Sequence, residues 1–431
     1  MHSHTRSHTN IFGMSWNPAK AAMAILLTLL FLTLLLLFLT LTAPPVQGQT
    51  YSVIHNFTGG GDGGDPWSGP TLDSAGKLYG TTFGGGLSNC GGGCGVVYRL
   101  AHQGSAWVLN PLYSFTGGPD GGYPVGAVTF GPNGTLFGTT TEFGSYGGGT
   151  LFNLRPRPTA CPTVLCPWSE ASIYQYPLNS NLPWPKGNII FDPAGALYGT
   201  TTYGGEYGFG SVFQLSPSGG GWTETDIYDF QGLADGGYPG VGLAMDGAGN
   251  LYGTTYFGGA YGWGTVFELT GSGSSWTRTT LYSFENRSDG HGPAGGVTFD
   301  NAGNLFGGTL YGGSNGEAGI VYELSPSDGG WTFTLLYTFS GNGGTDSNVT
   351  IDSSGNIYGT TVADGSYEQG SVFKLTPSDG GWIETDLYDF TGGTDGGSPK
   401  GAVATGSNGN LYGTASQGGA YNQGVVWQIA P

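Results

Sequence analysis

An Asp-Gly-x-x-Pro motif recurs along the chain and places carboxylates at regular intervals. Its aspartates are Asp62, Asp120, Asp235, Asp289 and Asp395. The sixth repeat carries Asp346 in a shortened version of the motif, and the third carries Asn179, Asn181 and Trp184 instead. Carboxylates can accept hydrogen bonds from sugar hydroxyls, and with carbonyl oxygens they could hold a hard cation such as Ca²⁺. The structural alternative is that each aspartate caps backbone amides in its own turn.

Aromatic residues recur in a second, glycine-rich segment of each repeat. The segment GGEYGFG contains Tyr207 and Phe209, and GGAYGWG contains Tyr261 and Trp263. Comparable positions are held by Tyr146, Tyr367 and Tyr421. Aromatic faces can stack on sugar rings, whereas in the structural alternative each tyrosine packs over the neighbouring repeat. We therefore predict a ligand-binding surface with the candidate residues Asp62, Asp120, Asp235, Asp289, Asp395, Tyr207, Tyr261 and Trp263.

Signals for catalysis are weak by comparison. Residues 49–431 contain three histidines, His55, His102 and His291, which the repeat pattern places too far apart for a shared metal site. His291 lies near Asp289 and is only a weak candidate for a general base. The chain has no lipase-like serine elbow and no phosphate-binding Gly-Lys loop. No catalytic residue is assigned, although pairs from the ring of aspartates leave a polysaccharide lyase or glycosidase as an alternative.

A second motif, Leu-Tyr-Gly-Thr or a near copy, sets the period of the chain. Its copies begin at Leu78, Leu136, Leu197, Leu251, Leu305, Ile357 and Leu411. The spacing is almost constant, and the steps from Leu197 to Leu251 and from Leu251 to Leu305 are equal. This long period, with many glycines and short aromatic and β-branched runs, is typical of β-propeller blades. The sequence therefore predicts an all-β fold with seven blades of four antiparallel strands.

One blade is clearest between Pro239 and Phe284. Its four strands are predicted at residues 241–246, 250–256, 264–269 and 276–284. In such a meander, the segment before the first strand and the segment between the second and third strands emerge on the same face. The Asp-Gly-x-x-Pro motifs and the tyrosine segments should therefore share that face. The turn between the first two strands begins with an aspartate that we interpret as structural, at Asp73, Asp192, Asp246, Asp300 and Asp352.

The phase of the repeat predicts how the ring closes. Residues 51–57 (YSVIHNF) match a fourth strand, and the chain ends just after residues 425–429, which match a third strand. The N-terminal strand should therefore complete the last blade, which leaves no open sheet edge. We expect one domain over residues 49–431 and a monomer.

Residues 1–48 read as an export signal that precedes the domain. Arg6 and Lys20 precede an apolar stretch from Ala21 to Leu41, and small residues lead to Gly48. This pattern predicts a signal peptide cut after Gly48, with an uncleaved membrane anchor as the alternative. We expect a secreted, periplasmic or cell-surface protein that meets a membrane only through an uncleaved leader.

The charge of the remaining chain excludes some partners. Residues 49–431 keep nine of the eleven Lys and Arg and all 29 acids, which gives 9 − 29 = −20. Nucleic acids and anionic membranes are poor partners for such a surface, whereas glycans, extracellular proteins and cations are compatible with it. No cofactor other than Ca²⁺ is suggested.

Four cysteines form two local pairs, Cys90 with Cys94 and Cys161 with Cys166. In an exported chain such pairs are typical of disulfides. A zinc site is disfavoured because the first pair should lie on the face of the tyrosine segments and the second on the opposite face.

The LYGTT, GG and VF-x-L pattern resembles the tandem repeat of exported bacterial proteins named after Gloeobacter and Verrucomicrobium. The resemblance covers nearly all of residues 51–431 and implies an exported protein with no established activity or site. Here the last strand ends the chain without a sorting tail, so we expect any anchoring to come from the leader. A weaker similarity to the kelch repeat rests on Gly204, Gly205, Phe213 and Trp222. The leading hypothesis is a non-catalytic exported propeller that binds a glycan or another extracellular ligand. A polysaccharide-active enzyme and a purely structural surface protein are the alternatives.

Overall fold

The computed structural model describes Met23, Leu29 and residues 49–86, 90–157, 168–178, 182–273, 275–314 and 318–431. The chain divides into Met1–Gly48 and Gln49–Pro431. The predicted leader, the pair Cys161–Cys166, and Asn179 and Asn181 lie outside the described residues. Among the described residues, no helix is long and apolar enough to cross a membrane.

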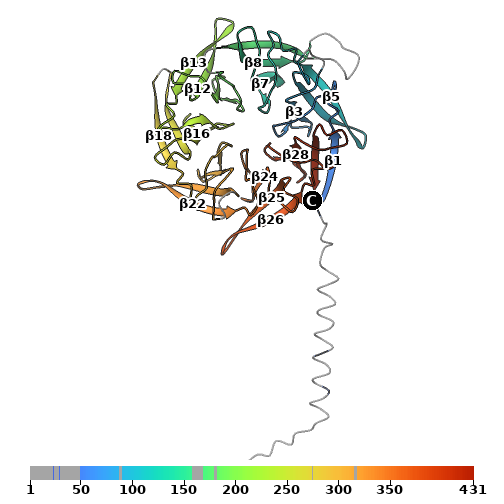
Figure 1. Ribbon diagram of the computed structural model, residues 1–431, viewed down its shortest axis with the longest axis vertical. Coiled ribbons are helices and arrows are strands. Elements are labelled where there is room, and N and C mark those ends of the chain that lie inside the picture. The colour runs from blue at the N-terminus through green and yellow to red at the C-terminus, as the bar shows by residue number, and fades with distance from the viewer. Residues whose placement is uncertain are drawn as a thin grey trace, which may run out of the picture. The chain divides into compact units, whose positions relative to one another are not determined.

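Seven antiparallel sheets follow one another around a ring, as the repeat predicts (Figure 1). Blade 1 contains β2 (Thr71–Leu72), β3 (Leu78–Thr82), β4 (Val96–Gln103) and β5 (Ala106–Ser114). Blade 2 contains β6 (Thr129–Phe130), a short 3-10 turn (Pro132–Gly134), β7 (Leu136–Thr140), β8 (Gly147–Arg155) and β9 (Ser169–Pro177). Blade 3 contains β10 (Ile190–Phe191), β11 (Leu197–Thr201), β12 (Ser211–Ser218) and β13 (Gly221–Asp229).

The remaining blades repeat this order. Blade 4 contains β14 (Gly237–Pro239), β15 (Ala244–Met245), β16 (Leu251–Phe257), β17 (Thr265–Ser272) and β18 (Ser275–Ser283). Blade 5 contains β19 (Thr298–Phe299), β20 (Leu305–Gly308), β21 (Ile320–Ser327) and β22 (Gly330–Thr338). Blade 6 contains β23 (Thr350–Ile351), β24 (Ile357–Thr361), β25 (Ser371–Ser378) and β26 (Gly381–Asp389). Blade 7 contains β27 (Ala404–Thr405), β28 (Leu411–Ala415), β29 (Val425–Ala430) and β1 (Thr50–Asn56).

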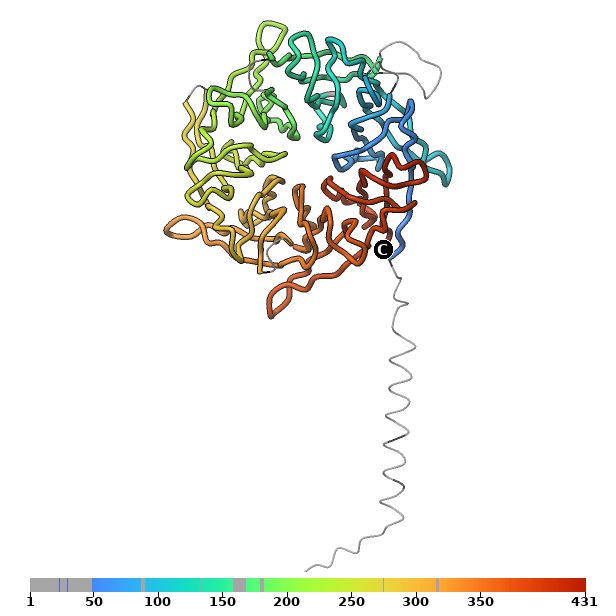
Figure 2. The backbone as a smooth tube through the Cα atoms, in the orientation of Figure 1, coloured from blue at the N-terminus to red at the C-terminus, as the bar shows by residue number. Residues whose placement is uncertain are grey.

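Ring closure by the N-terminal strand is confirmed. β1 pairs with β29, with Tyr51 opposite Ile429 and Val53 opposite Trp427. Figure 2 shows the first strand of the domain beside the last turns of the chain. The last blade therefore contains three C-terminal strands and one N-terminal strand.

The Leu-Tyr-Gly-Thr core is a packing motif in the second strand of each blade. In β11 all five residues of LYGTT are buried. A Cβ atom on Gly199 would lie only 2.5 Å from the ring of Phe213 in β12, so only glycine fits beneath that ring. Thr200 then donates to the Gly240 carbonyl of the next blade at 3.1 Å. The motif thus joins a blade to its aromatic core and to its neighbour.

The structure refines two details of the predicted blade. The first strands are shorter than expected, since only Ala244–Met245 of residues 241–246 is a strand in blade 4. That blade gains β14, which pairs with β16 as an additional short strand. The structural interpretation of the turn aspartates is confirmed, because Asp246 accepts hydrogen bonds from Ala248 and Asn250. Corresponding turn contacts are made by Asp73, Asp192, Asp300 and Asp352.

Candidate functional site

The segments before the first strands and between the second and third strands form one face of the ring, which we call the loop face. On it, each predicted aspartate closes its own turn. Asp395 accepts hydrogen bonds from the Thr391 N–H at 2.8 Å and the Tyr388 hydroxyl at 3.0 Å. At Asp62 the tyrosine is replaced by His55, whose Nε2 lies 3.1 Å from Oδ2. Asp120, Asp235 and Asp289 accept the same two hydrogen bonds as Asp395. One comes from the backbone N–H four positions earlier and the other from the tyrosine hydroxyl seven positions earlier.

These hydrogen bonds give the aspartates a structural role in the turns of the loop face. Burial alone would raise the pKa of Asp395, but hydrogen bonds from Thr391 and Tyr388 stabilise its carboxylate and lower the pKa below its usual value. A role of the five carboxylates in ligand binding stays a prediction. The turn contacts favour the structural alternative, because they already occupy much of the carboxylates' hydrogen-bonding capacity.

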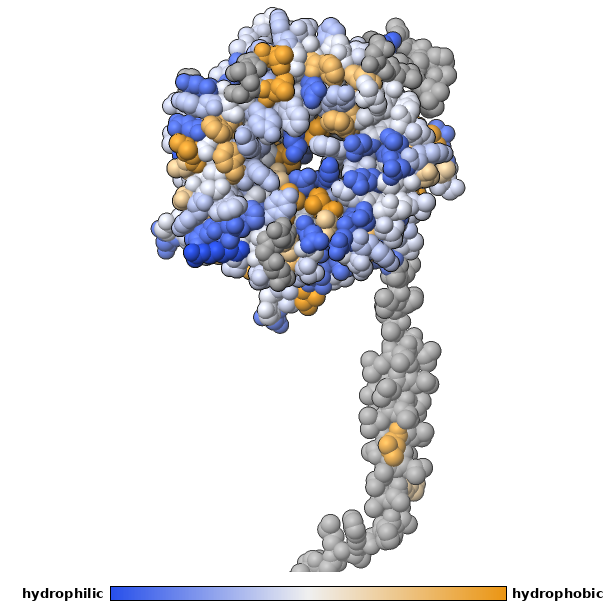
Figure 3. Space-filling view, viewed as in Figure 1, coloured by the Kyte–Doolittle hydropathy of each residue, from blue (hydrophilic) through white to orange (hydrophobic). Residues whose placement is uncertain are grey.

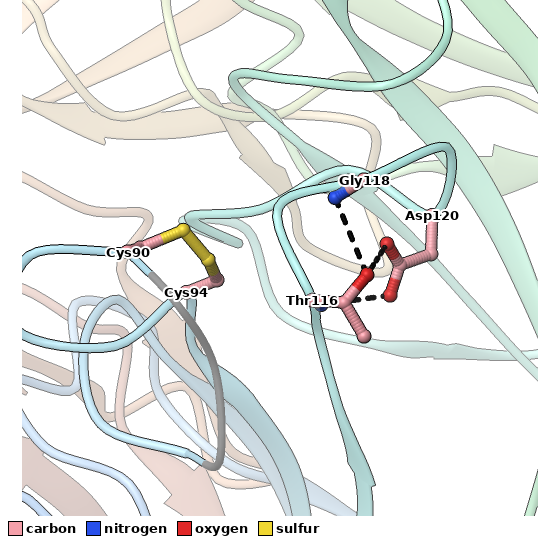
Figure 4. The surroundings of a disulfide bond; sticks show 5 residues. All are labelled: Cys90, Cys94, Thr116, Gly118 and Asp120. Atoms are coloured by element: carbon pink, nitrogen blue, oxygen red, sulfur yellow. Dashed lines mark hydrogen bonds between the residues drawn. A yellow bond between two sulfur atoms is a disulfide. The ribbon is translucent and has the colours of Figure 1, made fainter.

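A disulfide joins Cys90 and Cys94 in the loop between β3 and β4, as predicted. Figure 4 shows it beside the turn of the next blade, where Asp120 caps Thr116. A Cβ atom on Gly117 would lie 2.6 Å from one cysteine sulfur and 2.7 Å from the other. The disulfide therefore packs directly against the adjoining blade.

The predicted tyrosines are exposed on the loop face. Tyr207 is 47% exposed and Tyr261 is 56% exposed. Tyr261 lies in a turn closed by a hydrogen bond from Gly262 to Gly259, and the positive φ of 84° falls on Gly262. The turn therefore requires the glycine and not the tyrosine. Comparable exposure is seen at Tyr146, Tyr367 and Tyr421.

Trp263 differs from the tyrosine two residues before it. Its ring lies 4.9 Å from that of His291, at 69°, in the turn of the next blade. Phe209 holds the same repeat position and packs against Gly232 of its neighbouring blade. Although Trp263 is 41% exposed, this position serves contact between blades.

Two arrays of half-buried aromatic rings lie on the loop face. In blades 1 and 2, Trp67 stacks on Phe83 at 4.9 Å, and Phe83 stacks on Tyr123 at 4.7 Å. In blades 3 and 4, Tyr203 joins Trp184 to Tyr238, and Tyr238 lies 4.6 Å from Phe257. Each array gathers rings from separate segments of two adjacent blades, which motif reading alone does not bring together.

Several of these aromatic residues adopt a strained backbone conformation. Tyr123, Trp184 and Tyr238 precede prolines, yet their φ angles are 58°, 48° and 53°. This left-handed region is unfavourable for non-glycine residues, particularly before proline. A hydrogen bond from the Tyr238 N–H to the Phe209 carbonyl of the preceding blade, at 2.8 Å, holds it there. Trp184 shows that blade 3 keeps this conformation without the Asp motif.

A cavity of about 180 Å³ lies at the centre of the ring. Figure 3 shows the ring hollowed at its centre, with hydrophilic and hydrophobic surfaces around the opening. The residues that carry its polar and aromatic chemistry are Trp67, Lys186, Asn188, Asp346, Asn348 and Lys400. Burial raises the pKa of Asp346, while the charges of the two lysines oppose that shift. Sequence reasoning did not identify this cavity.

The prediction that Asp346 belongs to a shortened Asp-Gly-x-x-Pro motif is wrong. In blade 7 the motif aspartate, Asp395, precedes the core residue Leu411. In blade 6 the residue at the same separation from the core residue Ile357 is Gly341. The place of the motif aspartate in blade 6 therefore belongs to Gly341, and Asp346 holds a different one.

Asp346 shares its place in the repeat with two lysines. Asp346, Lys186 and Lys400 each precede the repeat core of their own blade by the same number of residues. We call this the inner-ring position. In the other blades it holds Trp67, Val125, Gly240 and Ala294.

Acidic pairs occur on outer strands rather than at the cavity. Burial, followed by the charge of Asp226, raises the pKa of Glu224 in β13 to about 7. Glu384 in β26 has a pKa of about 7 for the same reasons, with Asp386 as its neighbour. Within the described part of the chain, no group of three or more His, Cys, Asp or Glu side chains is arranged to hold a metal ion.

Comparison with solved structures supports the propeller fold. The extracellular domain of BT4673 from B. thetaiotaomicron aligns in two structures, with TM-scores of 0.54 and 0.52 and identities of 14% and 11%. These alignments cover 89% and 88% of this chain but 42% and 40% of the other. PorZ, a surface component of the type-IX secretion system of Porphyromonas gingivalis, aligns with a TM-score of 0.48 and 14% identity, over 85% of this chain and 46% of PorZ. The chain thus spans less than half of each.

Comparison with curated protein sequences gives no significant match. The Gloeobacter/Verrucomicrobia repeat matches residues 168–350 and 319–431, which together include more than half of the chain. The matched region contains five of the seven repeat cores. The chain therefore belongs to the Gloeobacter/Verrucomicrobia repeat family.

Proposed function

We propose that this chain is an exported, non-catalytic propeller that binds glycans through its loop face. The observation that carries the proposal is the pair of aromatic arrays, one of which is stacked and reaches the central cavity through Trp67. Half-exposed rings held rigidly by their neighbours offer flat apolar surfaces at little entropic cost on binding. The exposed tyrosines extend this surface towards the periphery.

Export is supported by chemistry within the chain. The Cys90–Cys94 disulfide is typical of proteins that fold in an oxidising compartment. The apolar stretch Ala21–Leu41 supplies a leader of the required character. The proposed location is therefore outside the cytoplasm, as a secreted, periplasmic or surface protein.

Binding has better support than catalysis. The carboxyl groups with pKa values near 7 lie on outer strands, whereas the cavity is lined by residues at the inner ends of the blades. His291 packs against the rings of Trp263 and Tyr311, which serve contact between blades. A substrate in the cavity would meet donors and an aromatic platform, which suits recognition.

A glycan array with the full chain tests the proposal, followed by calorimetry on each positive glycan. We expect Trp67→Ala and Tyr261→Ala each to weaken binding by about 2- to 10-fold, the usual worth of an aromatic contact. The matched control is Ile383→Ala, because Ile383 is 57% exposed on the outer strand β26. Absence of binding to every glycan, or binding that neither aromatic substitution changes, would overturn the proposal.

The same titrations with and without EDTA test the Ca²⁺ prediction. If a cation bridges glycan and carboxylates, EDTA abolishes binding and added Ca²⁺ restores it. Release of reducing ends or of unsaturated products during incubation would instead favour the enzyme alternatives.

A further inference from the structure

The inner-ring position breaks the symmetry of an otherwise repetitive ring. It keeps a constant separation from the repeat core in every blade, so it is one structural place in seven copies. Three copies carry charge, and they belong to blades 3, 6 and 7. The other four copies are uncharged, so the fold does not require a charged side chain at this position.

The two lysines are not engaged by ion pairs. Lys400 rests on the indole of Trp67, with Nζ 3.9 Å from the ring centroid, and Lys186 reaches the cavity from blade 3. Within the described residues, no carboxylate comes within ion-pair distance of either ammonium group. Both nevertheless influence Asp346, so both lie near the same space. Residues 49–431 contain nine Lys and Arg side chains, and two of them line this cavity.

Other donors face the same space. The side-chain oxygen of Asn188 accepts the Ala127 N–H at 2.7 Å, and that of Asn348 accepts the Gly296 N–H at 2.8 Å. These contacts fix each amide so that its NH₂ group remains able to donate. Ser347, a residue only 5% exposed, lines the cavity, and its buried hydroxyl has no hydrogen-bond partner among the described residues. In the other blades the position of the two asparagines is glycine or alanine, at Gly69, Ala127, Gly242, Gly296 and Ala402.

Two carboxyl groups stand near these donors. Asp346 lies in the cavity, and Asp65 lies close enough to Lys400 to respond to its charge. Burial raises the pKa of both, while the lysine charges oppose that shift. Two ammonium groups, two amides and a hydroxyl thus face a single carboxyl within the cavity. A complementary ligand is rich in acceptors and carries negative charge.

We propose that the central cavity is the subsite for an anionic sugar residue, whose acidic group binds between Lys186 and Lys400. This deepens the glycan-binding function proposed above and rests on it for the nature of the ligand. The cavity is smaller than the roughly 300–1,000 Å³ pockets of drug-sized ligands, so it suits a single sugar unit or the end of a chain. Trp67 supplies an apolar wall of the cavity beside Lys400, and the amides of Asn188 and Asn348 donate to the oxygens of the sugar.

Calorimetry with paired ligands tests this subsite. A hexuronate should bind the full chain at least about ten-fold more tightly than the neutral hexose, because charge-assisted hydrogen bonds are the stronger class. Lys186→Gln and Lys400→Gln should each weaken hexuronate binding by about ten-fold while changing hexose binding little. Lys77→Gln is the matched control, since it removes one charge from an exposed turn. Asp346→Asn should tighten hexuronate binding.

The outcomes separate this inference from the glycan-binding proposal. Equal affinity for hexose and hexuronate, unchanged in both lysine variants, would overturn the anionic subsite and leave glycan binding standing. Looser hexuronate binding by Asp346→Asn would also overturn it, because Asp346 would then be an attractive contact. Binding of acetate or sulfate that the lysine variants abolish, without binding of any sugar, would support an anion site and refute the glycan. Circular dichroism of each variant confirms that the ring is folded.

Discussion

The Thr414 hydroxyl donates a hydrogen bond to the Ser68 carbonyl at 2.9 Å, although 346 positions separate the two residues. The same contact joins blades that are consecutive in sequence, such as Thr254 to Gly295. The two blades at the closure are therefore joined in the same way as blades 4 and 5. Stability of the ring should depend on the closing strand as much as on any internal strand.

Deletion of residues 51–57 should destabilise the whole ring. It removes Phe57, which is fully buried, and the stack of Tyr51 on Tyr388 at 3.6 Å, and it exposes the edge of β29. We expect the melting temperature to fall by roughly 10 °C or more in calorimetry, with one cooperative transition. Ser52→Ala, an exposed change in the same strand, serves as the control. An unchanged melting temperature would show that closure contributes little.

Thr254 and Thr139 occupy the same repeat position and should respond differently to valine. Thr254 donates to the Gly295 carbonyl at 2.6 Å, whereas the buried Thr139 hydroxyl has no hydrogen-bond partner among the described residues. Thr254→Val should lower the free energy of unfolding by about 1 kcal/mol. Thr139→Val should leave it unchanged or raise it, because it removes an unsatisfied polar group. Urea titrations compare the two, and equal losses would refute the assignment.

Glu224 and Glu384 should make the protein less stable as the pH rises through the neutral range. The pKa of each rises from 4.5 to about 7 on folding, so between these values the folded state binds more protons than the unfolded state. Folding therefore favours the protonated form of both carboxyl groups. The resulting contribution to the free energy of unfolding is lost as the pH rises from about 4.5 through 7. Replacement of both by glutamine should flatten this part of the profile of melting temperature against pH. The exposed Glu206→Gln should not, and an identical profile in the double variant would contradict the shifted values.

Loss of the Cys90–Cys94 disulfide should destabilise the protein modestly. The closed loop is short, with a sequence separation of 4, so the chain-entropy contribution is about 2 kcal/mol. The Cys90→Ser/Cys94→Ser double variant should show that loss in urea titrations under oxidising conditions. Treatment with a reductant should destabilise the native protein more than the variant, because the variant retains only the predicted Cys161–Cys166 pair. A reductant effect of equal size on both proteins would contradict this account.

The fold was predictable because its determinants repeat. Gly199 lies under Phe213 in one blade, and the same glycine–aromatic pair produces a visible motif in every blade. The closing strand was also predictable, because residues 51–57 carry the alternation of an outer strand. The lengths of the first strands were not, since residues 241–245 carry no polar side chain and the pattern does not mark where hydrogen bonding begins.

The central cavity was harder to predict because its residues share a position and not a type. Lys186, Asp346 and Lys400 produce no motif when the chain is read along its length. They become visible only when blades are aligned and one position is compared across all of them. The tyrosine segments show the converse, because Tyr261 and Trp263 look alike in sequence while only the tyrosine is left without a packing role.

At the inner-ring position a blade can exchange its side chain while it keeps the repeat core. Its side chains range from none at Gly240 to an indole at Trp67, while its separation from the repeat core stays constant. Mutation or shuffling of whole blades can therefore alter the lining of the cavity without altering the frame. Such a ring offers one exchangeable side chain in each of its seven blades, and related chains could acquire new ligands by substitution at one inner-ring position at a time.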